Sequence, residues 1–216
     1  VEKMVCDNVI ATRNLVNYAE KAGITKIIFL STLSIHGLVE EKVLNEQTPI
    51  HNPAPYGVSK FLCEQLLADK AKSIDSIAIR LPGIIGRNAV RNWLTRSLEA
   101  SFRGEDIKVF NPSLPFNNAV HVNDLCEFIT HLIGFNWSGS KAVCLGASGI
   151  TTAGDVADLL AKETGQGSKV LVEEAHRPGF TICSDFAQTS FGYKPMEINT
   201  MLKQFCIENK KYKGIP

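Results

Sequence analysis

Tyr56 and Lys60 carry side chains that could move a proton together. They stand four residues apart, and the chain continues from Lys60 as FLCEQLLADKAK. If this segment is helical, both side chains project from one face of the helix. A free tyrosine titrates at about pH 10 and is a poor base at neutral pH, but a nearby ammonium group favours the phenolate. Such a pair could take a proton from an alcohol, or return it, while a hydride leaves or reaches the carbon.

A short apolar run ends at two hydroxyl side chains upstream of this pair. Residues 27–30 read IIFL, the pattern of a strand covered on both faces, and Ser31 and Thr32 follow. Open parallel sheets bind ligands at the carboxyl ends of their strands, where the Thr32 hydroxyl could hold a substrate oxygen. A Tyr and a Lys at this spacing also occur by chance, on ordinary surface helices. The strand and the proline-rich loop at 49–55 favour the functional interpretation.

From Thr32 to Lys60 the chain resembles the extended short-chain dehydrogenase/reductase family, in its NAD-dependent epimerase and dehydratase group. Those proteins have a strand ending in Ser-Ser or Ser-Thr, a V-Y-G-like turn, and then Y-x-x-x-K. Here the turn reads Ile35-His36-Gly37, with His in place of the usual Tyr. Two further pieces match in the family's order. They are RLPxxxG at 80–86, and VHVND at 120–124 followed by RPG and FGYKP.

The resemblance implies an α/β fold, with a partial doubly wound, Rossmann-like parallel sheet and a smaller α/β substrate lobe. Residues 1–86 would belong to the cofactor domain, and residues 118–147 would return to it. Residues 87–117 and 148–216 would form the substrate-binding lobe. Helices are expected at 4–22 and 53–73, and the resemblance implies that a homodimer could form through them.

The resemblance also implies catalytic roles. Tyr56 would be the base, Lys60 would lower its pKa and bind the nicotinamide ribose, and Thr32 would orient the substrate. Asn8 lies on the expected helix 4–22, at the place of the family asparagine that supports the lysine or a bridging water.

Contacts to the nicotinamide ring and to the substrate are implied in the same way. Leu81 and Pro82 would pack near the ring. Ser34, two residues after Thr32, is a candidate for substrate binding. Asn92, Asn117 and Arg177 are the remaining candidates for substrate binding. Asn92 opens a segment similar to a family helix start, although a plain surface helix fits the residues equally well.

Two positions depart from the family pattern. Asn117 replaces an arginine and lacks its charged fork, and Phe180 replaces the usual aspartate.

The glycine-rich phosphate loop of a dinucleotide site is missing from the sequence. Gly83, Gly86 and Ala89 spell G-x-x-G-x-x-A, but they follow Tyr56, whereas the loop belongs after the first strand. The chain opens at Val1, and its first methionine is Met4. We therefore expect a piece of a longer protein, or a cleavage product, that is not competent alone. The residues that select NAD or NADP would lie upstream.

Three functions fit these observations. The first is an NAD-dependent nucleotide-sugar epimerase, which oxidises a sugar hydroxyl transiently and then reduces it again. The second is an NADPH-dependent reductase of a keto-sugar or related carbonyl. The third is a non-catalytic remnant that binds a nucleotide-sugar. Leu33 and Ser34 follow Thr32 where dehydratases carry acidic residues, so dehydration is disfavoured. The particular sugar is left open.

Composition narrows the partners and the compartment. Charged residues make up 21% and hydrophobic residues 44% of the chain, with a net charge of +1. This balance gives no case for nucleic acid or a membrane surface as partner, and no apolar run reaches the length of a bilayer span. The six cysteines are scattered singly, which predicts reduced thiols, no metal site and a cytoplasmic protein.

Overall fold

The structure is a computed structural model that describes residues 1–173 and 178–213. The chain divides into two compact units. Unit 1 contains residues 1–81, 128–145 and 183–193, and unit 2 contains residues 82–127, 146–182 and 194–216. In the described ranges, no helix is long and apolar enough to cross a bilayer.

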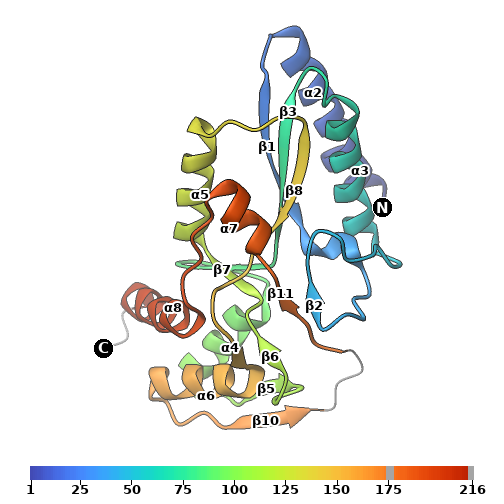
Figure 1. Cartoon of the computed structure of the whole chain (residues 1–216). Helices are drawn as coiled ribbons and strands as arrows, with labels where there is room; N and C mark the ends of the chain where they lie inside the picture. Colours follow the sequence, from blue (N-terminus) through green and yellow to red (C-terminus); the bar gives the residue numbers. More distant parts are fainter. Residues whose placement is uncertain (174–177, 214–216) are drawn as a thin grey trace. The chain divides into compact units, whose positions relative to one another are not determined.

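A three-stranded parallel sheet forms the centre of unit 1 (Figure 1). Its order is β1 (Lys26–Thr32), β3 (Asp75–Leu81) and β8 (Ser140–Cys144). The middle strand β3 is apolar apart from Asp75, Ser76 and Arg80, and Ser76 through Leu81 are all buried. Ser31 and Thr32 of β1 pair in register with Arg80 and Leu81 of β3. The three strands therefore end at one edge of the sheet, with hydroxyl groups at the end of β1.

Helices cover both faces of this sheet. Figure 1 shows α2 (Ala11–Lys21) and α3 (Pro55–Asp69) on one face, with α7 (Asp185–Phe191) and the second half of α5 (Val122–Gly134) on the other. Val16 and Ala19 of α2 are buried against Leu67 of α3. The other short elements are α1 (Glu2–Met4), the π-helical turn η1 (Val5–Ile10), the 3-10 turn η2 (Leu33–His36) and β2 (Val43–Leu44).

Unit 2 is built from short strand pairs around three helices. β4 (Gly83–Ile85) pairs in parallel with β7 (Ala119–His121), and β5 (Ile107–Phe110) pairs in parallel with β10 (Val170–Glu173). β6 (Pro115–Phe116) pairs antiparallel with β9 (Thr151–Thr152), and β11 is Thr181–Ile182. The helices α4 (Trp93–Phe102), α6 (Ala153–Thr164) and α8 (Ile198–Lys213) share one buried core that includes Leu98, Leu160 and Phe205. The predicted α/β architecture with a parallel sheet is confirmed.

Candidate active site

Thr32 and Ser34 place two hydroxyl groups side by side at the end of β1. The Thr32 Oγ1 atom accepts a hydrogen bond from the Ser34 backbone N–H at 3.1 Å and donates one to Ser34 Oγ at 3.1 Å. Thr32 thereby caps the η2 turn that follows the strand. Thr32 is buried and Ser34 is exposed, so a ligand at this edge of the sheet would meet the Ser34 hydroxyl first.

Tyr56 and Lys60 occupy the first two turns of α3. Pro55 starts this helix after an extended Ala54, an arrangement that suits a proline at the first helical position. The Tyr56 side chain is 43% exposed, which leaves it accessible to a ligand. The Lys60 ammonium lies 4.1 Å from the centroid of the Phe29 ring on β1. Burial lowers the pKa of Lys60, and the neighbouring Cys63 and Glu64 oppose this effect.

Asn8 contacts the helix that carries Tyr56 through Ser59. The Asn8 Nδ2 donates to Ser59 Oγ at 2.9 Å, and Ser59 Oγ donates to the Tyr56 carbonyl at 2.8 Å. Asn8 sits in the π-helical turn η1, a form that is frequent at functional sites. The amide therefore holds the first turn of α3.

The described contacts bring the predicted catalytic residues into one region but do not join all of them. None of the hydrogen bonds described for residues 1–173 and 178–213 links the Tyr56 hydroxyl to Thr32 or Lys60. Their catalytic roles stay a prediction.

A buried ion pair between Glu64 and Arg80 is the feature of unit 1 that sequence reasoning missed. Arg80 Nη2 donates to Glu64 Oε2 at 2.7 Å, and both side chains are buried. The signal was present in the sequence, because an arginine inside an apolar strand needs a partner when it is buried.

Two predicted substrate residues in unit 2 bind backbone groups. Asn92 caps α4, because its Oδ1 accepts from the Thr95 N–H at 2.8 Å, while its Nδ2 donates to the Ile84 carbonyl at 3.0 Å. Asn117 is buried, and its amide both donates to and accepts from the Ile182 backbone, at 2.8 Å in each case. These two asparagines therefore organise the local backbone.

The remaining predicted positions are at the end of β3 and beyond it. Leu81 is the buried last residue of β3, and Pro82 follows it, half-buried. Arg177 lies outside the described residues.

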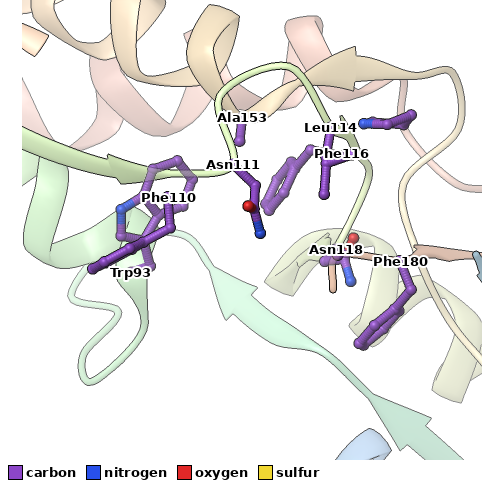
Figure 2. Close-up of a pocket in the computed structure, with 10 residues that line it drawn as sticks. Trp93, Phe110, Asn111, Leu114, Phe116, Asn118, Ala153 and Phe180 are labelled. Carbon is purple, nitrogen blue, oxygen red and sulfur yellow. The ribbon is translucent and has the colours of Figure 1, made fainter. Parts of the chain in front are cut away.

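A cavity of about 270 Å³ in unit 2 was also missed (Figure 2). Its walls include four aromatic side chains and two asparagines: Trp93, Phe110, Phe116, Phe180, Asn111 and Asn118. Figure 2 shows Trp93 and Phe110 on one side of the view, and Phe180 with Asn118 on the other. The Trp93 and Phe116 rings pack edge to face, with centroids 5.7 Å apart, and Trp93 Nε1 donates to the Lys108 carbonyl at 3.0 Å. The cavity could take a flat ring with a few polar edge groups.

A parallel sheet covered by helices, with hydroxyl groups at the end of one strand and Tyr-x-x-x-Lys on the next helix, defines a Rossmann-type α/β protein. The NAD dependent epimerase/dehydratase family matches residues 2–144, and the chain belongs to this family.

Relatives and solved structures agree with this placement. The chain is 28% identical over 180 residues to the UDP-glucose 4-epimerase of Rhizobium meliloti, which covers 72% of this chain and 54% of that protein. It is 25% identical over 234 residues to the UDP-glucose 4-epimerase of Bacillus subtilis, covering 96% and 68%. The crystal structure of UDP-glucuronic acid 4-epimerase from Bacillus cereus in complex with NAD shares the fold. Its TM-score is 0.83 at 17% identity, over 96% of this chain and 69% of that one. The chain spans about half the length of the Rhizobium relative.

Proposed function

We propose that the complete protein is an NAD-dependent nucleotide-sugar epimerase, which oxidises a sugar hydroxyl transiently and reduces it again from the other face. The observation that supports this proposal is the packing of α3, which carries Tyr56 and Lys60, on β1, which ends at Thr32, with the Lys60 ammonium over Phe29, in a chain of the epimerase/dehydratase family. Curated relatives named UDP-glucose 4-epimerase support the reaction, and the neighbour in complex with NAD supports the cofactor.

The residues of unit 1 fit the nicotinamide-ribose end of NAD. The Lys60 ammonium is a donor for ribose hydroxyls. Leu81 at the end of β3 and Pro82, the first residue of unit 2, are proposed as the apolar contacts of the ring. When bound, the cofactor would accept and return a hydride. Tyr56 would take the proton from the sugar hydroxyl and later give it back, because its exposed phenol can reach a ligand. Thr32 and Ser34 would hold the sugar oxygen in line, and Asn8 would keep the first turn of α3 in place through Ser59.

The residues of unit 2 fit the nucleotide part of the substrate. The aromatic cavity suits a base, which stacks on ring faces and forms hydrogen bonds with amide groups such as Asn118. Asn92 and Asn117 would shape this region by fixing backbone, and Arg177 is proposed as the cationic contact for the diphosphate.

We also propose that the protein is a homodimer through α2 and α3. These helices pack on each other and still leave large apolar side chains in solvent. Leu15 and Tyr18 of α2 are 59% and 63% exposed, and Leu62 of α3 is 43% exposed. A second copy would cover this surface.

The cysteines carry thiols and not disulfides, which supports a reducing compartment such as the cytoplasm.

A second candidate function is a dehydrogenase or reductase with net cofactor turnover. One relative supports it, the D-erythronate dehydrogenase of Haemophilus influenzae, which is 30% identical over 103 residues, or 46% of this chain. The two functions share the same proton-transfer groups and differ in whether the oxidised product leaves.

Incubating the complete protein with NAD and a panel of UDP-sugars separates the candidates. Interconversion of two sugars without net NADH formation is the expected result. Stoichiometric formation of NADH from NAD, or loss of NADPH in a parallel assay with that cofactor and a keto-sugar, would instead indicate a dehydrogenase or reductase. No binding of either cofactor or sugar nucleotide would exclude both.

A further inference from the structure

Glu64 lies on α3, one turn beyond Lys60 and two turns beyond Tyr56. Its carboxylate is buried and accepts hydrogen bonds from two other side chains. Its carboxylate accepts from Arg80 Nη2 at 2.7 Å and from Arg80 Nε at 3.2 and 3.3 Å. It also accepts a hydrogen bond of 2.5 Å from the Ser31 hydroxyl. Glu64, Arg80 and Ser31 are each at most 7% exposed. One carboxylate thus connects α3 to both β1 and β3.

The network places its contact to β1 next to a proposed catalytic residue. Ser31 directly precedes Thr32, and it pairs in register with Arg80 across the sheet. Two residues earlier on the same strand, Phe29 lies beneath the Lys60 ammonium. The helix that carries Tyr56 and Lys60 is therefore held at neighbouring points on the strand that ends in Thr32.

The Nη1 group of the Arg80 guanidinium also has polar partners, so the whole guanidinium is held in place. Arg80 Nη1 donates to the Glu46 carbonyl at 3.3 Å and lies 3.5 Å from His36 Nε2. His36 Nδ1 is 2.9 Å from the Thr48 carbonyl, so the Nδ1–H tautomer leaves Nε2 to face the guanidinium. Burial, with the Arg80 charge, lowers the pKa of His36 and favours the neutral ring.

Net stability is a poor explanation for this arrangement. A buried ion pair is often no more stabilising than a pair of apolar side chains of similar volume, because desolvation offsets the attraction. Directional hydrogen bonds to two strands do fix the position of a helix, whereas apolar contacts let it shift.

We propose that Glu64 is a positioning residue, which locks α3 on β1 and β3 so that Tyr56 and Lys60 keep a constant place relative to Thr32; this rests on the proposed function. Glu64 itself would not touch the substrate. A displacement of about 1 Å in a proton-transfer site can cost on the order of 100-fold in rate.

The test compares four forms of the complete protein with NAD and the sugar nucleotide that it converts: wild type, S31A, E64M/R80M and E20Q. S31A removes only the link to β1, and we expect kcat to fall about tenfold at unchanged KM, with a Tm lowered by a few degrees because a buried hydrogen bond to a carboxylate is lost. E64M/R80M removes both charges, so neither is left buried alone, and we expect Tm to hold while kcat falls on the order of 100-fold. E20Q breaks the exposed Glu20–Lys70 pair and should change neither value.

A stable E64M/R80M with wild-type kcat would overturn the proposal, and so would wild-type kcat in S31A. If the double variant fails to fold, S31A decides.

A wild type that converts no sugar nucleotide at all would defeat the proposed function instead. In that case the titration of Lys60, followed by NMR in protein labelled with ¹³C-lysine, tests Glu64 without turnover. The pKa of Lys60 should be lower in E64Q than in wild type, because Glu64 raises it and the Arg80 charge stays in place. An unchanged value would contradict the inference.

Discussion

Lys60 carries a partly buried positive charge that lowers stability and that the proposed chemistry would use. Its ammonium lies on the Phe29 ring, and burial lowers its pKa below the usual 10.5. Asn8 and Ser59 fix the turn above it. Phe29 and Ser59 carry no local signal of these contacts, whereas the family resemblance predicted a supporting role for Asn8. The sequence could therefore predict the candidate catalytic side chains and Asn8, but not the ring and the hydroxyl that contact them.

Replacing Lys60 by methionine should separate activity from stability. We expect K60M to abolish turnover and to raise the free energy of unfolding at pH 7 by roughly 0.5–1 kcal/mol, since a partly buried cation becomes an apolar side chain. The pKa of Lys60 is lower in the folded than in the unfolded state. The wild type therefore gains stability relative to K60M as the pH rises from the folded pKa towards 10.5.

Denaturant unfolding at a series of pH values measures this difference. K70M, which removes a partly exposed surface lysine paired with Glu20, is the matched control and should change stability by less than about 0.5 kcal/mol. A less stable K60M at pH 7 would contradict the argument.

Trp93 offers the largest aromatic face of the unit 2 cavity. Stacking of a base on an aromatic side chain contributes about 1–3 kcal/mol, so W93A should raise KM for the sugar nucleotide about 10- to 100-fold. The value of kcat should change less than threefold. Steady-state kinetics measure both, and L171A on the exposed side of β10 serves as control. An unchanged KM in W93A would show that the cavity does not bind the base of the sugar nucleotide.

At the scale of elements, α3 packs closely on the turn after β1 because Gly57 has no side chain. Gly57 is buried, and a Cβ there would come within 2.1 Å of the Ser34 carbonyl oxygen. The start of the helix therefore packs directly on the backbone that follows Thr32. The apolar run at 27–30 predicted the strand, and the family pattern predicted the helix. The close approach of Gly57 and the ion pair of Glu64 with Arg80 join segments far apart in sequence. Arg80 in an apolar strand indicated that a partner was needed, but no local pattern could identify Glu64 as that partner or show the contact of Gly57 with Ser34.

Adding one methyl group at this point should separate the two elements. We expect G57A to lower the free energy of unfolding by about 1–3 kcal/mol, because backbone must move to relieve the overlap. It should also lower kcat at least tenfold. Gly134, near the end of α5, has no atom within 4 Å of an added Cβ, so G134A is the matched control. Thermal unfolding and steady-state kinetics of both variants test this prediction. A G57A variant with the stability and kcat of the wild type would contradict it.

At the scale of the whole molecule, each unit supplies a different part of the proposed activity. Unit 1 carries the proton-transfer groups and unit 2 carries the aromatic cavity. The sequence predicted the first set from one motif. The sequence did not predict the cavity, because its walls come from α4, β5, β6 and the segment at 179–180. Only the fold brings these segments together.

The proposed dimer belongs to this scale as well. Introducing a charge into the apolar surface of α2 and α3 should separate the copies, so L15E is expected to run as a monomer in size-exclusion chromatography with light scattering, where the wild type runs as a dimer. V172E, at a position 67% exposed on β10, should stay dimeric. A monomeric wild type would refute the dimer.

The catalytic claim is tested most directly by Y56F in the complete protein. The variant removes one hydroxyl from an exposed ring, so its fold and its binding of NAD should match the wild type. The rate of sugar interconversion at saturating substrate is the measurement. We expect it to fall on the order of 1000-fold, since the only proposed base is lost. Interconversion at the wild-type rate would show that Tyr56 transfers no proton.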